Sequence, residues 1–463
     1  MKKKNNDINP LVVFGSLAGA TVFAYYIAKK FGEKSSMCSI KDYKNHYGKE
    51  VYFVGGGLAS LAGAAYLIRD CNMPGKNIHI LEGMHILGGS NDGAGDVRNG
   101  FIARGGRMLN EETYENFWEL FSNIPSLEFP DKSVTEEVLN FDHLHPTNAQ
   151  ARLVDKEGNI IDVTSMGFST KDRLLLGKLM ITPENVLDDL TIEDWFNDSP
   201  HFFTTNFWYM WQTTFAFQKW SSLFEFKRYM ERMIFEFSRI ETLEGVTRTP
   251  YNQYESLIVP IKDYLAKNGV DFSINARVYD LDFKEGKGIT VTAMYVETEN
   301  GKSKIQLNPG DVCIVTNGSM TDNATLGDFN TPALYKPDNP MSGELWKNIA
   351  KKKKGLGNPS PFFDYPEETN WESFTVTMRR NKLLKMIEQF SGNVPGSGAL
   401  MTFKDSNWLM SIVVAAQPHF KNQPLDTTIF WGYGLFTDVE GDYVKKKMRD
   451  CTGKEILTEL LHH

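Results

Sequence analysis

The segment from Val51 to Ser90 constrains the fold most, because it contains two predicted strands joined by a glycine turn and a helix. Val51 to Val54 is an apolar strand, and Gly55 and Gly57 follow it directly. Glycines here let the backbone approach a pyrophosphate, and the first N–H groups of the next helix point at the phosphates. Glu82 closes the second strand 25 residues after Gly57, near the roughly 20-residue offset at which a carboxylate accepts ribose hydroxyls. This order predicts a dinucleotide-binding α/β unit.

Ser60 stands where the third glycine of G-x-G-x-x-G is expected. That position packs the helix against the strand, so a small residue is sufficient. The alternative interpretation is a glycine turn in an ordinary doubly wound sheet. The agreement of strand, turn, helix and acid favours the nucleotide site.

The length of 463 residues allows two or three domains, and the net charge of -8 is spread along the chain. The lysines and arginines do not gather into a basic patch of the kind that would indicate a nucleic-acid partner. The four cysteines lie far apart without a C-x-x-C pair, which argues against disulfides and a structural zinc site. We therefore predict no metal site and a reducing, intracellular setting.

The N-terminal region predicts a membrane anchor. Residues 11–28 carry no charge and are flanked by lysines on both sides. As a helix they would measure roughly 27 Å, enough for a bilayer core. A signal peptide is the alternative, but no small-x-small cleavage site follows. We expect a single transmembrane helix within residues 1–34, a membrane-associated protein, and a body on the cytoplasmic side.

The rest of the chain alternates between α/β, β and helical patterns. A small antiparallel meander is expected between Asp271 and Ser319, ending in a strand followed by Thr-Asn-Gly-Ser. The expected organisation is a linker at 35–50, the first part of the nucleotide-binding domain at 51–150, a mostly helical substrate domain at 151–260, the meander and the return to the nucleotide-binding domain at 261–330, and a continuation of the substrate domain at 331–463.

An aromatic segment occupies the middle of the chain. Trp195 to Phe237 holds sixteen aromatic residues among 43, on a predicted helical stretch opened by a capping box of Thr191 and Asp194. Such residues form either a core or a long apolar ligand channel. Tyr229 and Gln253 are the polar groups that this segment and its end bring to the site.

Nine motifs in order resemble one family. They are VGGGLASL, GGSNDGAGD, RGGR, NFWYMWQTTFAFQKW, EFKRYM, LEGVTRTPYNQY, VTNGSM, QPHF and DCTGKEIL. Together they resemble the oleate hydratase family, also called myosin-cross-reactive antigen, over residues 51–463.

The resemblance implies an FAD-binding, glutathione-reductase-like Rossmann domain with an inserted meander and a largely helical substrate domain. It also implies a hydro-lyase that adds water to the cis double bond of unsaturated fatty acids such as oleate or linoleate. A homodimer is left open. The residues expected at FAD are Gly55, Gly57, Ser60, Glu82, Gly89, Ser90, Gly105, Gly106, Arg107, Met108, Val278, Thr316, Asn317, Gly318 and Ser319.

Alkene hydration requires an acid at one carbon and a base that takes a proton from water at the other. Tyr229 matches the proton-donating tyrosine of the family. The family's water-activating glutamate directly follows RGGR, but Met108 stands there, and a thioether cannot take a proton. Glu111 is the candidate base, with Glu112 beside it. The alternatives are that both are exposed first-turn residues, or that a flavin-associated group or a backbone-held water replaces the base.

Gln253 and His419 match family positions near the fatty acid carboxylate. The Thr and Asn that precede that histidine in the family are Val413 and Ala415 here, so two neutral donors are missing. Without the family match, His419 would be interpreted as a structural turn residue, because it follows a proline. Family members continue past His463, so the resemblance implies a C-terminally truncated sequence.

Two further interpretations stay open. The missing glutamate allows a flavin-dependent fatty acid isomerase or oxidoreductase. Together with the truncation, it also allows an inactive protein that binds FAD and lipid.

Overall fold

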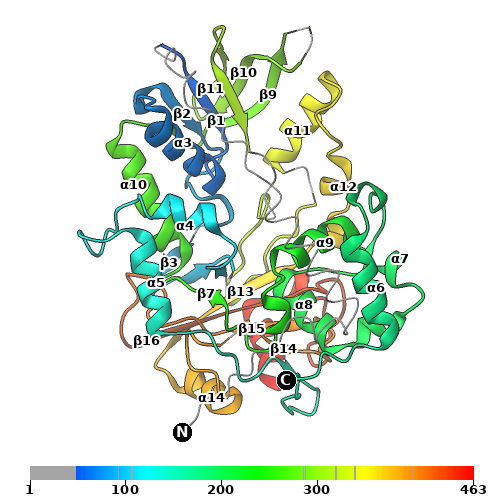
Figure 1. Cartoon of the computed structure of the whole chain (residues 1–463). Coiled ribbons are helices and arrows are strands. Elements are labelled where there is room, and N and C mark those ends of the chain that lie inside the picture. The colour runs from blue at the N-terminus through cyan, green and yellow to red at the C-terminus, as the bar shows by residue number, and fades with distance from the viewer. Residues whose placement is uncertain are drawn as a thin grey trace.

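The structure is a computed structural model that describes residues 48–463 except 92, 106–107, 285, 287, 317, 319–320, 338–339 and 399. Figure 1 shows a small parallel sheet and its meander at one end of the molecule and a larger sheet at the other. A group of helices, α6 to α9, lies beside the larger sheet (Figure 1).

The parallel sheet has the strand order β12-β1-β2-β8. Its strands are β12 (Val312–Val315), β1 (Val51–Val54), β2 (Ile78–Leu81) and β8 (Asp271–Ser273), and all neighbours run parallel. Helices α3 (Leu58–Cys71) and α10 (Val259–Lys267) contact each other and share a core with the sheet. This crossover arrangement confirms the predicted α/β fold.

The meander lies where the alternating sequence predicts it. Its strands β9 (Arg277–Phe283), β10 (Val291–Thr298) and β11 (Gly301–Gln306) pair antiparallel. Helix α11 (Met341–Lys352) contacts β9, and its buried Leu345 and Ile349 join the core of the meander. One face of the meander is therefore covered by a helix.

The larger sheet has five strands in the order β13-β16-β15-β14-β6. They are β13 (Glu372–Arg379), β16 (Thr427–Gly434), β15 (Met410–Val413), β14 (Met401–Phe403) and β6 (Leu153–Val154). Only the pair of β14 and β6 is parallel. Residues of α14 (Lys382–Ser391) and α15 (Gly453–His462) pack into its core.

A hairpin of β3 (Gly93–Asp96) and β4 (Gly100–Ala103) is fastened to the larger sheet. The amides of Phe101 and Ala103 donate to the hydroxyls of Thr377 and Thr375 on β13, at 2.9 and 3.0 Å. The loop that begins at Arg104 therefore starts from a fixed point.

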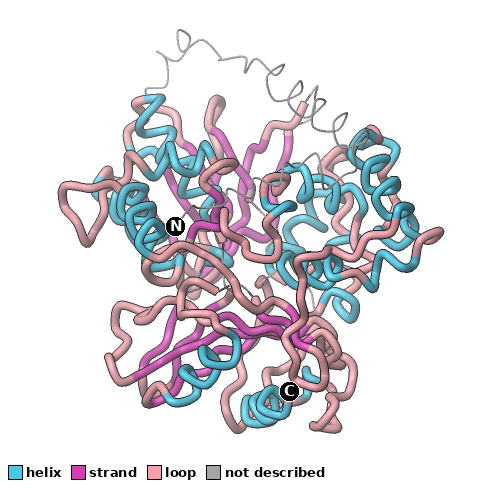
Figure 2. The backbone as a smooth tube through the Cα atoms, turned by 60° about the horizontal axis from the view of Figure 1, so that its bottom comes forward, coloured by secondary structure: helices cyan, strands magenta, loops and turns pink. Residues whose placement is uncertain are grey.

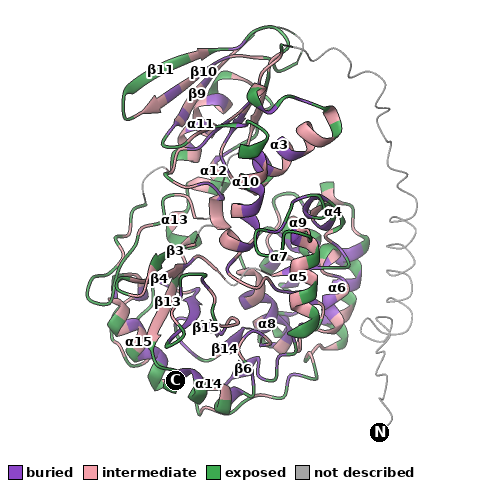
Figure 3. Cartoon of the chain, turned by 90° about the vertical axis from the view of Figure 1, so that its left-hand side faces the viewer, coloured by how far each residue is buried: buried purple, intermediate pink, exposed green. Residues whose placement is uncertain are grey.

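The aromatic segment folds into several short helices rather than one. They are α7 (Ile192–Phe196), the 3-10 turn Pro200–Thr204, α8 (Asn206–Phe215) and α9 (Leu223–Arg232), with α6 (Thr170–Ile181) packed beside them. The predicted capping box of Thr191 and Asp194 is confirmed at the start of α7. Trp208, Trp211 and Phe226 are almost wholly buried in one cluster, so these aromatics form a core. Figure 3 shows this burial along α6 and α8.

Shorter elements link these parts, and Figure 2 shows how much loop runs between them. The remaining helices and strands are β5 (Leu109–Asn110), α4 (Glu115–Phe121), α5 (Val134–Leu144), β7 (Val246–Thr247), a π-helical turn at Tyr254–Ile258, α12 (Ser360–Phe363) and α13 (Pro366–Thr369), with 3-10 turns at Gly75–Asn77, Gly89–Asn91, Glu184–Val186, Glu236–Ser238 and Met448–Asp450.

The prediction of a membrane-anchored protein is corrected. Residues 11–28, on which it depends, lie outside the described residues. Within residues 48–463, apart from the gaps given above, no helix is long and apolar enough to cross a membrane. The longest described helix, α3, has 14 residues and ends near Arg69 and Asp70, whereas a span needs about 20 apolar residues.

Candidate functional site

The glycine turn after β1 has the backbone that only glycine adopts easily. Gly55 has a φ of +99°, and a Cβ on it would lie 2.7 Å from the carbonyl oxygen of Thr316. Gly57 is the N-cap of α3, with no side-chain cap and no acidic residue in the first turn. The helix therefore presents unsatisfied N–H groups and the positive end of its dipole at this turn.

A second glycine loop lies against the first. The amide of Gly88 donates to the carbonyl of Gly56 at 2.9 Å. A Cβ on Gly89, which has a φ of +56°, would stand 3.3 Å from the Cα of Gly57. The two backbones thus form a cradle without side chains beside the start of α3.

Glu82 lies at the end of β2, as predicted, and is buried. Its carboxylate accepts the amides of Gly56 at 2.7 Å and Met84 at 2.8 Å. Each carboxylate oxygen accepts one of these two hydrogen bonds and keeps capacity for another donor, such as a ribose hydroxyl.

The other predicted FAD residues are distributed as follows. Ser60 is buried on α3 and shares a 2.9 Å hydrogen bond with the hydroxyl of Thr316, which follows β12. Gly318 lies just beyond Thr316, Ser90 lies in the turn after Gly89, and Val278 lies buried on β9. Gly105 and Met108 lie on either side of residues 106–107, which the structure does not describe. Gly106, Arg107, Asn317 and Ser319 lie outside the described residues.

A pocket that is partly open to solvent lies between the π-helical turn and the larger sheet. Its wall brings together Gln253 and His419, as the sequence predicts, and also Val413, Ala415 and Gly105. None of the described residues in this wall is acidic. Apolar side chains such as Phe141, Ile429 and Phe430 complete it.

The same wall contains a buried cation that the sequence analysis missed. Arg248 is 9% exposed, and its guanidinium donates to the hydroxyl of Thr147 and the carbonyl of Gly398. No carboxylate forms an ion pair with it within the described part of the chain. Burial lowers the pKa of Arg248 to about 10, and the charge of Asp142 partly opposes this. Its position five residues before Gln253 was the only signal in the sequence.

The wall also holds hydrogen-bond donors without acceptors. The Nε2 atom of Gln253 and the Nε1 atom of Trp431 are buried and have no partner among the described residues. Burial, and then the charge of Arg248, lower the pKa of His419 to about 4. The histidine is therefore neutral at pH 7, and the wall offers a cation and unused N–H groups to an anion.

Tyr229 does not line this cavity. It lies on α9, is 39% exposed, and packs edge-on against Phe215 and Phe217 with ring centroids 5.5 and 5.1 Å away. Arg232 lies on the same helix, and its guanidinium lies 5.0 Å from the centroid of the Tyr114 ring. Burial raises the pKa of Tyr114, Arg232 lowers it, and Tyr229 raises it, so these three side chains form one group.

The candidate bases lie in the turn just before Tyr114. Glu111 and Glu112 are both exposed, and Glu112 forms an ion pair with Arg239 at 2.8 Å. Met108 packs against the aromatic core. Asn110 is buried, and its amide donates to Glu236 and to the carbonyl of Gly245, so it serves the structure of this turn.

Comparison with known proteins agrees with the motifs. A family model described as the MCRA family matches residues 48–463. A linoleate hydratase from Lactiplantibacillus plantarum is 41% identical, with 88% of this chain and 77% of that protein aligned. An oleate hydratase from Streptococcus pyogenes serotype M49 (strain NZ131) is 38% identical, with 90% and 71% aligned.

A solved oxidoreductase from Methanosarcina mazei aligns with 83% of this chain and 79% of its own, at 12% identity and a TM-score of 0.48. That likeness is too distant to support a function. The family match over nearly all described residues and the two hydratase relatives are decisive, and this chain belongs to the MCRA family.

Proposed function

We propose that this protein binds FAD and adds water to the cis double bond of an unsaturated fatty acid such as oleate or linoleate. The observation that carries the proposal is the cavity wall in which buried Arg248 lies with the unpartnered donors of Gln253 and Trp431. A carboxylate would satisfy all of them. The hydratase relatives support the reaction type.

The glycine cradle fits FAD. The uncapped start of α3 and the close backbones of Gly57 and Gly89 suit a pyrophosphate, and Glu82 suits a ribose. Because hydration leaves the substrate's oxidation state unchanged, FAD would supply shape and charge at the site and no net electrons.

The site proposed for the fatty acid carboxylate can function although Val413 and Ala415 replace two hydrogen-bond donors of the family. Both line the cavity but offer no hydrogen bond. Arg248 supplies a full charge instead, and a charge-assisted hydrogen bond is worth about 1.5–3 kcal/mol. Neutral His419 adds one N–H donor without placing a second cation beside Arg248.

In the proposed reaction the Tyr229 hydroxyl gives its proton to one alkene carbon, using the π electrons for the new C–H bond. A water oxygen bonds to the other carbon and loses a proton to a base, so the product gains one water. Phe215 and Phe217 pack edge-on against the ring of Tyr229 and fix its orientation.

We propose Glu111 as the base, because Glu112 is already paired with Arg239. No ion pair of Glu111 with a basic group is found within the described residues. Replacing Glu111 by Gln should then remove hydration, and replacing Glu112 by Gln should leave most of it. Equal activity of both variants would exclude Glu111.

The direct test is incubation with FAD and oleate in water enriched in oxygen-18. The expected product is a hydroxy fatty acid heavier than oleate by one labelled water. A shifted double bond without added oxygen would instead indicate an isomerase. The possible homodimer stays a prediction, which a measurement of the molar mass in solution by light scattering would test.

A further inference from the structure

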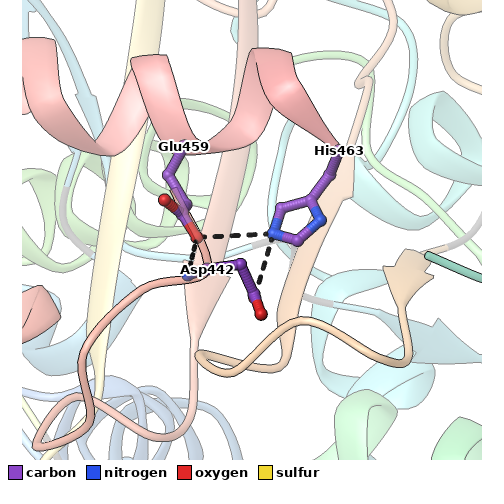
Figure 4. Close-up of side chains that lie close together, drawn as sticks. All are labelled: Asp442, Glu459 and His463. Atoms are coloured by element: carbon purple, nitrogen blue, oxygen red, sulfur yellow. Dashed lines mark hydrogen bonds and ion pairs between the residues drawn. The ribbon is translucent and has the colours of Figure 1, made fainter. Parts of the chain in front are cut away.

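We propose that Asp442, Glu459 and His463 form a binding site for a divalent transition-metal ion, with Zn²⁺ as the expected ion. Glu459 lies on α15, and His463 is the residue directly after that helix. Because His463 comes four residues after Glu459, both side chains project from the same face of the helix. Asp442 comes from the loop after β16. Figure 4 shows the three side chains converging on one point.

The distances from the imidazole nitrogen to the two carboxylate oxygens suit a small metal ion. Nε2 of His463 lies 3.5 Å from Oδ2 of Asp442 and 3.5 Å from Oε1 of Glu459. Tetrahedral Zn²⁺ with bonds of about 2.0–2.1 Å requires neighbouring ligand atoms about 3.3–3.4 Å apart. One imidazole and two carboxylates are ligands that zinc accepts in proteins.

The imidazole itself points to a missing partner. The side chain of His463 is 5% exposed, and its Nε2 has no hydrogen-bond partner among the described residues. The ring is held by Phe403 and Tyr443, with centroids 5.7 and 5.2 Å away. A buried polar atom fixed in this way between two carboxylates is satisfied by a metal ion or by a proton on the ring.

The carboxylates are positioned before any ion binds. Glu459 is fully buried and accepts the backbone amides of Asp442, Tyr443 and Val444. Gly441 makes room for it, because a Cβ there would lie 2.8 Å from Oε1. These amides fix the orientation of the Glu459 carboxylate before an ion binds.

Asp442 completes the site from its open side. Its Oδ2 accepts the amide of Asn407 at 2.8 Å, and its side chain is 32% exposed. Solvent therefore reaches the cluster on this side, and a water can fill the fourth zinc position. A bound ion would connect α15 to the loop that follows β16.

The sequence analysis predicted no metal site because it considered cysteine pairs. The signal was the pair of Glu459 and His463 at helical spacing, with the third ligand 17 residues before Glu459. That pattern is too common in exposed helices to predict a site without the packing around it.

The test uses the full chain, stripped with EDTA and then dialysed against ZnCl₂. We expect one zinc per chain by elemental analysis. We also expect Tm to rise by about 3 °C when free zinc exceeds Kd about 100-fold, and EDTA to reverse the rise. The variants are Asp442→Asn, which keeps an acceptor for Asn407, and His463→Ala. The matched control is His462→Ala, since His462 stacks on Tyr443 outside the cluster.

Loss of zinc binding in Asp442→Asn and His463→Ala, with full binding in His462→Ala, would support the site. Should His463→Ala fail to fold, Asp442→Asn and the EDTA titration of the parent decide the question. Absence of zinc from the parent, equal zinc in all variants, or a Tm that responds only to acidification would overturn the proposal.

Discussion

The backbones of Gly57 and Gly89 pass each other so closely that a Cβ on Gly89 would lie 3.3 Å from the Cα of Gly57. A substitution at Gly57 causes much less steric conflict. A Cβ on Gly57 would have only the Cα of Gly89 within reach, at 4.0 Å, and the φ of Gly57 is -75°. Substitutions at these two positions can therefore distinguish an effect on folding from an effect on nucleotide binding.

Replacing Gly57 by Ala should lower FAD affinity while leaving Tm nearly unchanged, because the methyl group enters the space proposed for the pyrophosphate. Replacing Gly89 by Ala should lower both, because an alanine at a φ of +56° is strained. Flavin absorbance per chain and a thermal melt without flavin provide the two measurements. Unchanged flavin content in the Gly57 variant would argue against this cradle as the phosphate site.

Replacing Arg248 by Gln should raise KM for oleate about 10- to 100-fold, because one charge-assisted bond to the carboxylate is lost. Binding of methyl oleate, which carries no carboxylate charge, should change little and serves as the control. The pKa of His419 should also rise from about 4, since Arg248 is the second cause of its depression after burial. NMR titration of His419 measures this without any turnover.

Replacing Tyr229 by Phe should reduce kcat at least about 100-fold, because general acid catalysis typically contributes that much or more. Flavin content and Tm should stay close to the parent, since the hydroxyl lies on a side chain that is 39% exposed. Tyr264→Phe on α10, which packs against the core of the parallel sheet, is the matched control. Full activity in the Tyr229 variant would assign the proton to another group.

Replacing Glu372 by Gln should stabilise the protein at alkaline pH. Burial, and then the charge of Asp450, raise the pKa of Glu372 from 4.5 to about 8. Between these values the unfolded chain releases a proton that the folded chain keeps, so stability falls as pH rises from 4.5 to about 8. The variant cannot ionise and avoids this loss, which is on the order of 5 kcal/mol.

Thermal melts at pH 5 and pH 8.5 measure that difference. The Tm advantage of Glu372→Gln should be small at the lower pH and about 5 °C at the higher one. Glu368→Gln, at an exposed position, is the control and should show no such trend. A constant difference at both pH values would mean that Glu372 keeps an ordinary affinity for protons.

Local sequence signals predicted much of the fold. The strand at Val51 to Val54, the meander and the Thr191 capping box depend on neighbours in the chain, and all are present. The aromatic segment was harder, because its interruption depends on Ala216, whose φ of +58° ends α8. Alanine gives no warning of a left-handed residue.

The cavity could be predicted only in part, for a related reason. Gln253 and His419 followed from motifs, but Arg248 acquires its importance from distant groups. Its partners Thr147 and Gly398 are 101 and 150 residues away along the chain. Whether an arginine is paired with a carboxylate is a property of packing, so periodicity and spacing could not reveal this cation.

The order of the parallel sheet also determines how the chain folds. Strand β1 pairs with β12, which begins 261 residues later, and β6 pairs with β14 across a comparable separation. Such high contact order makes folding slow, since long loops must close before these pairings contribute. On the ribosome, β1 must wait for most of the chain to emerge, with one edge unpaired and open to wrong partners. Limited proteolysis should therefore release no fragment that refolds alone.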